Sequence, residues 1–307
     1  MISTVRTVEV HGHRGARGLR PENTLPGFVH ALELGVDAVE LDVGLSADGV
    51  VVLNHDQVVS PVNLSDTGPA RPGDPMYPYV GKAIRDLRLD QLTTLDAGVR
   101  RPVSDDDPFV LTQLPLPGTA IPTLAEACAL LSRAPGVDLA VELKTDPDWP
   151  DADVAFFAAA VAEVLGAFDL TRRSRMLAFD WRVLVEARRY APDAGRVALV
   201  ETKTLVPGTR WLAGAEPGDP ARAALDVGAT VLSPERVLTT PELIDAAHSL
   251  ALPVVVWTVN EPADMERLVA CEVDAIVTDY PDRLRTVLAA HGLPLPRPFT
   301  RTLLQRL

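Results

Sequence analysis

Three carboxylates in this sequence have the type and spacing needed to bind a metal ion. Glu40 and Asp42 stand two positions apart in one short apolar run, and Glu142 stands near the end of another. Side chains two apart on a strand point to the same face, and a buried carboxylate without a partner is costly. We therefore expect the three to hold one hard divalent cation, Mg²⁺ or Ca²⁺, with water completing its shell.

A hairpin is predicted to bring a histidine to the same place. Only residues 46–49, which include Asp-Gly, separate the strand that carries Glu40 from the apolar run that begins at Val50. So short a segment cannot make a parallel crossover, whereas Asp-Gly between apolar runs is a strong hairpin signal. Pairing Leu45 with Val50 would place His55 opposite Glu40, beside the carboxylates.

A second histidine and two basic side chains complete the predicted site. His13 follows the first apolar run, and with His55 it would supply one proton acceptor and one donor near neutral pH. Arg14 can grip phosphate oxygens with its planar fork, and Lys144 adds another positive charge. Either histidine alone more often has a structural role, but their convergence on the carboxylates favours catalysis. The alternative is a structural salt-bridge cluster of the carboxylates with Arg14 and Lys144.

Three further residues have supporting roles in this interpretation. Trp257 ends a predicted strand, where its indole would form a wall of the substrate pocket or simply pack within the fold. Glu22 and Asn23 are expected to brace the loop after the first strand. Asn23 or Thr24 can cap the helix that follows.

Strands alternating with helices must position these residues. Short apolar runs predict eight strands, at 5–12, 37–43, 137–143, 175–179, 196–200, 230–232, 253–258 and 274–278. Helical periodicity predicts helices at 24–34, 124–132, 154–168, 182–190, 221–227, 241–249, 263–270 and 282–291. This alternation predicts an α/β fold with a single (β/α)8 TIM barrel. A doubly wound open sheet is the competing architecture, because counting strands cannot show closure.

The expected organisation is one barrel domain over residues 1–293, with an insertion after the second strand and a tail at 294–307. The insertion, 58–121, is rich in Pro, Gly and Asp, with a weak helical signal near 83–95. A loop of this length is usually functional or partly disordered, and its position places it on the C-terminal face of a barrel, where active sites lie. A lid and a surface embellishment remain equal alternatives.

The charge of the chain limits its partners. A formal net charge of −13 speaks against a nucleic-acid partner, so an anionic substrate must be held by a local positive site. No apolar run approaches the roughly 20 residues that span a bilayer, and residues 1–10 lack the pattern of a secretory signal. We therefore expect no stable membrane insertion and a location in the cytoplasm.

The motifs together resemble the glycerophosphodiester phosphodiesterase family. They are His-Arg-Gly at 13–15, Pro-Glu-Asn-Thr at 21–24, Glu-Leu-Asp-Val at 40–43, Asp-Gly at 48–49, His-Asp at 55–56, Pro-Thr-Leu at 122–124, Glu-Leu-Lys at 142–144 and Trp-Thr-Val-Asn at 257–260. The resemblance implies a TIM barrel, a metal at the three carboxylates, acid/base histidines at His13 and His55, and phosphate contacts from Arg14 and Lys144. The segment 58–121 matches no substrate-specific version of the family.

The function that this resemblance implies is hydrolysis of a small glycerophosphodiester to glycerol 3-phosphate and an alcohol. The head group, the oligomeric state, the nucleophile (water or the glycerol 2-hydroxyl) and the division of labour between the histidines stay open. One alternative is a phospholipase D-like enzyme acting on lysophospholipids or sphingolipids, which would need an apolar groove. Another is a non-catalytic phosphodiester-binding barrel, against which the complete set of histidines and carboxylates speaks. Metal-dependent aldolases have no use for the His-Arg-Gly and His-Asp elements.

Overall fold

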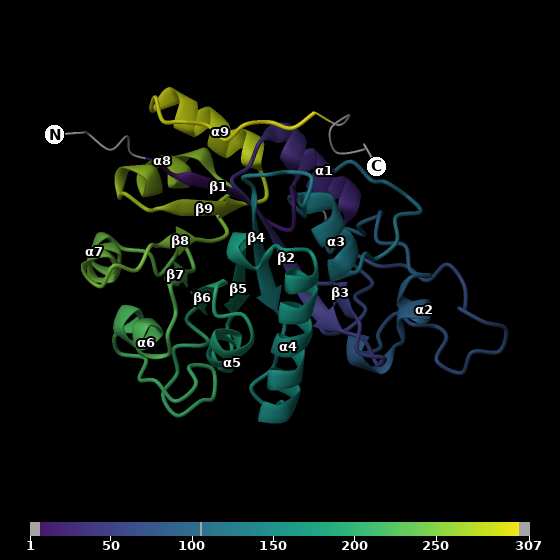
Figure 1. Ribbon diagram of the computed structural model, residues 1–307. Helices are drawn as coiled ribbons and strands as arrows, with labels where there is room; N and C mark the ends of the chain where they lie inside the picture. The colour runs from purple at the N-terminus through teal and green to yellow at the C-terminus, as the bar shows by residue number, and fades with distance from the viewer. Residues whose placement is uncertain (1–6, 105, 301–307) are drawn as a thin grey trace.

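Parallel strands form a barrel in the computed structural model of the protein, which describes residues 7–104 and 106–300 (Figure 1). The eight parallel strands of this described part are β1 (Glu9–Gly12), β2 (Ala38–Leu45), β4 (Asp138–Leu143), β5 (Ser174–Ala178), β6 (Gly195–Val200), β7 (Val231–Pro234), β8 (Val255–Val256) and β9 (Ala275–Thr278). Residues 5 and 6 of the first predicted strand lie outside the described residues. The strands are neighbours in the order β7-β6-β5-β4-β2-β1-β9-β8.

The two ends of this order also meet. Parallel bridges join Leu232 to Val254 and Glu235 to Trp257, so β7 contacts β8 and the sheet is a nearly closed barrel. The predicted TIM barrel is confirmed, and the open doubly wound sheet is excluded.

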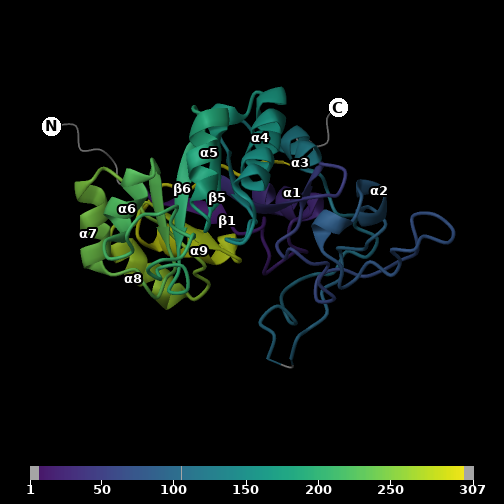
Figure 2. The same cartoon turned by 90° about the horizontal axis from the view of Figure 1, so that it is seen from below.

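Helices surround the strands in both views (Figures 1 and 2). They are α1 (Leu25–Leu34), α3 (Leu124–Leu131), α4 (Asp151–Ala167), α5 (Arg182–Tyr190), α6 (Pro220–Asp226), α7 (Pro241–Ser249), α8 (Pro262–Ala270) and α9 (Pro281–Ala290). All agree with the predicted helices to within three residues at each end. Thr24 caps α1 by accepting a hydrogen bond from the Gly27 amide, so the alternative of an Asn23 cap is wrong. Asn23 instead turns toward β2, as described below.

The predicted hairpin exists, with its register shifted by one residue. Strand β3 (Val51–Leu53) runs antiparallel to β2 and pairs Leu45 with Val51, not with Val50. The reason is the turn: the Ser46 amide donates to the Val50 carbonyl, and Gly49 has the positive φ of +79° that ends a three-residue loop. The ladder ends before His55, so the segment after β3, and not strand register, sets the place of this histidine.

The insertion forms a small apolar unit beside the barrel, on the side away from α6 and α7 (Figures 1 and 2). It contains a short 3₁₀ helix, η1 (Ile84–Asp86), and α2 (Leu89–Leu92), where the weak helical signal was. Its buried apolar residues, with Val52 of β3, are Val59, Leu64, Tyr79, Ile84, Leu87, Leu92, Leu95 and Ile121. This cluster gives the insertion a core of its own, separate from the barrel core.

The end of the insertion returns to the barrel and contacts the loop between β1 and α1. The Gln113 side chain donates to the Arg17 carbonyl, and the Leu114 amide donates to the Leu19 carbonyl. The guanidinium of Arg17 lies 4.7 Å from the ring centre of Phe109. The insertion therefore braces a loop that carries predicted site residues.

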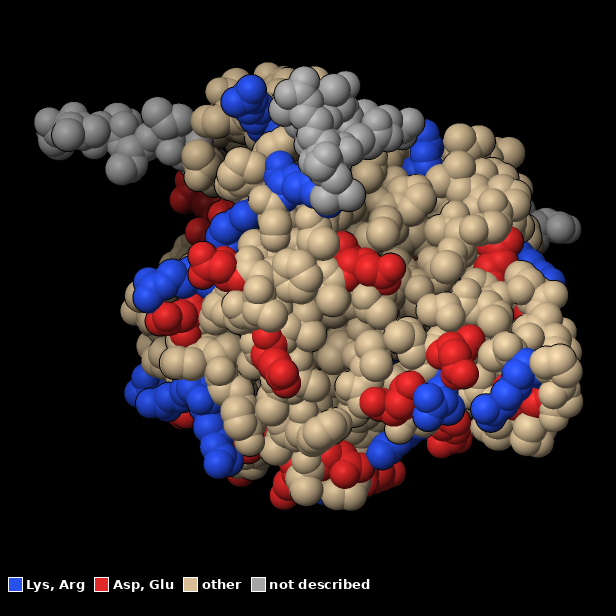
Figure 3. All heavy atoms as spheres, turned by 45° about the vertical axis from the view of Figure 1, so that its right-hand side comes forward, with Lys and Arg blue, Asp and Glu red and all other residues tan. Residues whose placement is uncertain are grey.

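Acidic and basic side chains alternate on the face that Figure 3 shows, and no single basic patch gathers there among the described residues. No helix within residues 7–104 and 106–300 is long and apolar enough to cross a membrane. The expectation of no nucleic-acid partner rests on net charge and stays a prediction, as does the location in the cytoplasm.

A charge cluster fills the N-terminal end of the barrel. The Arg175 guanidinium donates to Glu9 at 2.9 Å and to Asp138 at 3.2 Å, and lies 3.2 Å from Nε2 of His11. Burial alone would raise the pKa of Glu9, but His11 and Arg175 together lower it to about 2. Gly195 leaves the room for this arginine, because a Cβ there would lie 3.0 Å from the Arg175 Cγ.

We expect Arg175→Met to destabilise the protein by roughly 1–3 kcal/mol. It leaves Glu9 and Asp138 without their shared cation, and the cost is below that of a fully buried pair because both carboxylates keep some solvent contact. Urea denaturation at neutral pH measures this. The matched control is Arg172→Met, which breaks an exposed ion pair with Asp193 and should change stability little. Equal stability of the two variants would contradict a structural role for the cluster.

Candidate active site

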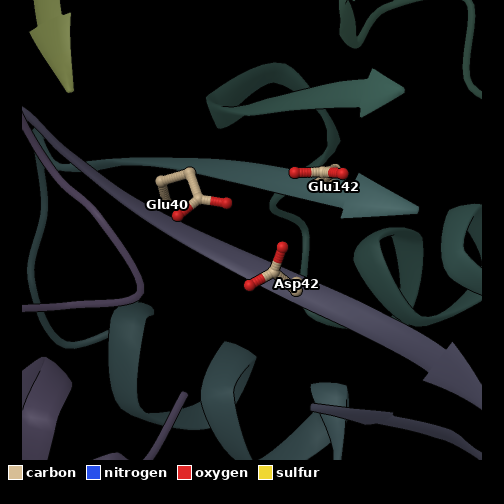
Figure 4. Close-up of side chains that lie close together, drawn as sticks. All are labelled: Glu40, Asp42 and Glu142. Atoms are coloured by element: carbon tan, nitrogen blue, oxygen red, sulfur yellow. The ribbon is translucent and has the colours of Figure 1, made fainter. Parts of the chain in front are cut away.

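The three predicted metal ligands lie together at the C-terminal end of the barrel (Figure 4). Glu40 and Asp42 project from β2, and Glu142 projects from β4, where it is the register partner of Asp42. All three side chains are buried, and one oxygen atom of each lies within 4.8 Å of the others. Neighbouring parallel strands present side chains of equal register on one face, which is why the local spacing predicted this convergence.

The chemistry of this cluster fits a hard divalent cation. Burial and the charges of Asp42 and Glu142 raise the pKa of Glu40 well above its ordinary value, so the site favours added positive charge. The Oδ1 atom of Asp42 is buried and has no hydrogen-bond partner among the described residues. Three buried carboxylates, one of them with an oxygen outside any hydrogen bond, form the kind of anionic donor set that Mg²⁺ or Ca²⁺ prefers. The cluster could therefore hold a metal ion.

Two basic side chains form ion pairs with carboxylates of this cluster. The Lys144 ammonium lies 2.6 Å from Glu142 and 3.5 Å from Asp42, and the Arg14 Nε lies 3.0 Å from Asp42. Burial alone would raise the pKa of Asp42, but Arg14 and Lys144 hold it well below its ordinary value. The same ion pairs were expected if the carboxylates formed only a structural salt-bridge cluster with Arg14 and Lys144. They also keep Asp42 ionised, which is the form that can bind a metal ion.

The loop between β1 and α1 orients Asp42 and Glu40. Asn23 adopts a left-handed φ of +53°, which asparagine tolerates. The Asn23 side chain makes two hydrogen bonds to Asp42. Its Nδ2 donates to the Asp42 carboxylate at 2.9 Å, and its Oδ1 accepts from the Asp42 backbone amide at 3.1 Å. The backbone amide of Arg14, also at positive φ, donates to Glu40 at 2.8 Å. The bracing role expected of Asn23 thus acts on a carboxylate of the cluster.

Arg14 is more enclosed than a free phosphate-binding side chain would be. Its guanidinium donates to Glu22 at 2.7 Å, and Glu22 also accepts from Arg17 at 2.7 Å. The turn before it requires glycine, because a Cβ on Gly12 would lie 2.2 Å from the Gly15 carbonyl oxygen. Arg14 still lines the cavity described below, and so does Arg17, which the sequence interpretation did not include.

His13 has a buried carboxylate partner that sequence reasoning missed. Its Nδ1 lies 2.6 Å from Asp279, and its Nε2 lies 3.9 Å from Glu40. Asn260 donates to the other Asp279 oxygen at 2.7 Å. Burial alone would raise the pKa of Asp279, but His13, Arg17 and Asn260 lower it to about 2. The available signal was the position of Asp279 directly after the last strand, at the same rim.

His55 reaches the same site from the other side. It is half-buried, and its Nδ1 lies 2.8 Å from Asp56. It lines the same cavity as Glu142 and Lys144, so the segment that follows the hairpin brings it to the carboxylates as predicted, although the register differs. Each histidine therefore has its Nδ1 engaged by a carboxylate. Nε2 remains the nitrogen for exchange of a proton with a ligand.

A cavity of about 150 Å³ lies within this ring of side chains. Both histidines, Arg14, Glu40, Glu142 and Lys144 line it, with an apolar floor of Leu177, Leu199 and Val277. Trp257 forms part of its wall. The indole donates to the Ser233 carbonyl at 2.9 Å and packs edge-to-face on Phe179 at 5.3 Å, so wall and packing roles coincide.

Fold and site together define a TIM-barrel protein whose rim gathers carboxylates, histidines and basic side chains around one cavity. The model of the Glycerophosphoryl diester phosphodiesterase family matches residues 13–283. Glycerophosphodiester phosphodiesterase of Caldanaerobacter subterraneus is 26% identical over 92% of this chain and 98% of its own length. Probable glycerophosphodiester phosphodiesterase 2 of Mycobacterium tuberculosis is 31% identical over 91% of this chain and 90% of its own.

Solved structures agree. A putative glycerophosphoryl diester phosphodiesterase from Silicibacter pomeroyi superposes with a TM-score of 0.83 at 33% identity, over 94% of this chain and 96% of that chain. An Oleispira antarctica phosphodiesterase in complex with the product sn-glycerol-3-phosphate has the same fold, with a TM-score of 0.70 at 24% identity over 92% of this chain and 97% of that chain. The chain belongs to the glycerophosphoryl diester phosphodiesterase family. It is an enzyme of that family, as the sequence motifs predicted.

Proposed function

We propose that this enzyme hydrolyses glycerophosphodiesters to glycerol 3-phosphate and an alcohol, with one Mg²⁺ or Ca²⁺ held by Glu40, Asp42 and Glu142. The observation that carries the proposal is that Glu40 and Glu142, with Asp42 close to both, line one cavity together with His13 and His55. The product in the Oleispira antarctica structure supports a small glycerol phosphate ligand. A bound divalent cation would neutralise phosphate charge and favour in-line displacement.

The side chains of this site would bind the phosphate and transfer protons. Arg14 and Lys144 offer positive charge to the phosphate oxygens. Burial alone would lower the pKa of Lys144, but Glu142 and Asp42 raise it, so its ammonium stays charged. One histidine takes a proton from the nucleophile at Nε2, and the other donates one to the leaving oxygen. The apolar floor limits water around the reacting groups.

A direct test is release of glycerol 3-phosphate from a panel of glycerophosphodiesters, measured by a coupled dehydrogenase assay. We expect turnover of at least one member that depends on Mg²⁺ or Ca²⁺. No release from any member would overturn the proposal. The phospholipase D-like alternative requires an apolar groove for acyl chains, whereas the aliphatic side chains of the cavity at the rim are confined to its floor and charged, polar and aromatic side chains form the rest of its lining.

The Asp279 contact leads to a separate prediction. Asp279→Asn should lower kcat by about 10- to 100-fold, less than loss of His13 itself, because it removes the charge that orients and supports the imidazole. Steady-state kinetics measure this. The matched control is Asp274→Asn, outside the cavity, where the carboxylate lies 2.8 Å from His248 Nε2 and accepts from the Val254 amide at 2.7 Å. If both variants keep the kcat of the unmodified enzyme, Asp279 does not act through His13.

A further inference from the structure

A second cavity, of about 340 Å³, adjoins the first at the rim of the barrel. The two share His55, Glu142, Lys144, Phe179 and Trp257. A phosphodiester carries one substituent on each side of its phosphorus. If its phosphate lies at the shared side chains, one substituent occupies each cavity. The smaller inner cavity suits glycerol, and the larger outer cavity has room for the alcohol that leaves.

Most charges of the outer cavity already have strong partners. Asp180, two residues after the end of β5, is buried and accepts from Arg182 at 2.9 Å and 2.6 Å through its two oxygens. Glu142 has Lys144 at 2.6 Å. These pairs leave little charge for a ligand in this cavity.

Glu201 is the exception among the carboxylates that line the outer cavity. It follows β6 directly and is half-buried. Its nearest cation is the Lys203 ammonium at 3.8 Å, on a side chain that is 85% exposed. An exposed pair at this distance contributes little, so a positively charged ligand can replace Lys203 at low cost.

Aromatic side chains form the rest of the wall. Trp211, Phe179 and Trp257 line the outer cavity with Glu201. Aromatic faces attract ammonium groups, most strongly when the group is desolvated. The Lys144 ammonium already lies 5.9 Å from the ring centre of Phe179. Carboxylate and aromatic wall together suit an organic cation.

We propose that the outer cavity binds the leaving alcohol and selects one that carries a positive charge, an amino alcohol such as choline, with Glu201 as the specificity-determining residue. The inference rests on the proposed glycerophosphodiester hydrolysis and extends it to the substrate class. Glu201 acts on recognition of the head group and has no part in proton transfer.

The test compares glycerophosphocholine with its neutral isostere, the 3,3-dimethylbutyl ester, in which carbon replaces the quaternary nitrogen. Shape is matched, so the ratio of the two kcat/KM values reports charge recognition. We expect the unmodified enzyme to favour the choline ester by about 10-fold. Glu201→Gln should bring the ratio close to one, and Lys203→Gln should raise it. Glu216→Gln removes an exposed carboxylate of the same β6–α6 loop and should leave the ratio unchanged.

Each outcome has a distinct meaning. A ratio near one in the unmodified enzyme, or an equal loss for both esters in Glu201→Gln, overturns the inference and leaves the proposed function intact, because glycerol 3-phosphate is still released. If Lys203→Gln and Glu201→Gln shift the ratio in the same direction, electrostatic selection is wrong. No release from either ester, nor from the wider panel, overturns the proposed function itself.

Discussion

His13→Ala and His55→Ala should each lower kcat on a natural glycerophosphodiester by about 10² to 10⁴, which is the usual contribution of a positioned proton-transfer group. Each imidazole has Nδ1 engaged by a carboxylate, Asp279 or Asp56, so each keeps Nε2 for the substrate. Acid/base catalysis by a pair needs one neutral and one protonated member, and neither can replace the other. Circular dichroism and thermal unfolding verify that both variants fold.

The leaving group separates the two roles. A p-nitrophenolate scarcely needs protonation, so the variant that lacks the general acid should recover most of its loss on an aryl phosphodiester. The variant that lacks the general base should not recover. His248→Ala is the control, because His248 lies at the surface against Asp274, away from both cavities. If both site variants stay fully active on both substrates, the two-histidine mechanism is wrong.

The second large effect concerns the carboxylates. Chelation with EDTA should abolish turnover, and added Mg²⁺ or Ca²⁺ should restore it. Glu40→Gln, Asp42→Asn and Glu142→Gln should each weaken cation binding by more than the roughly 10- to 100-fold that loss of an outer-shell partner costs. The reason is that a hard cation needs anionic oxygens, and an amide supplies only a neutral one.

Titration calorimetry with Mg²⁺ and Ca²⁺ measures this affinity without reference to turnover. Cation binding should also raise the unfolding temperature of the unmodified protein, and the carboxylate variants should lose most of this gain. Asp153→Asn, which alters an exposed ion pair with Arg85, is the matched control. Undiminished activity of exhaustively chelated enzyme would defeat the metal assignment.

Local pattern accounts for the elements that sequence analysis predicted well. A period of two residues places Glu40 and Asp42 on one face of β2, and the predicted helix at 124–132 begins at a capping box, in which Thr123 and Glu126 exchange hydrogen bonds. These signals act over two to four residues, so they are readable without knowledge of the fold. The hairpin was readable for the same reason, but its register depended on the conformation of Gly49.

The sequence by itself determined the alternation of strands and helices, the family, and the set of carboxylates and histidines that share one rim. Only the tertiary structure decided that β7 meets β8 to close the barrel, that Asn23 clamps Asp42, and that Asp279 supports His13 from 266 residues away. It alone also placed Glu201 in a second cavity beside the site. The physical reason is range: periodicity is set by neighbours along the chain, whereas contacts between distant loops depend on how all the strands pack around the barrel.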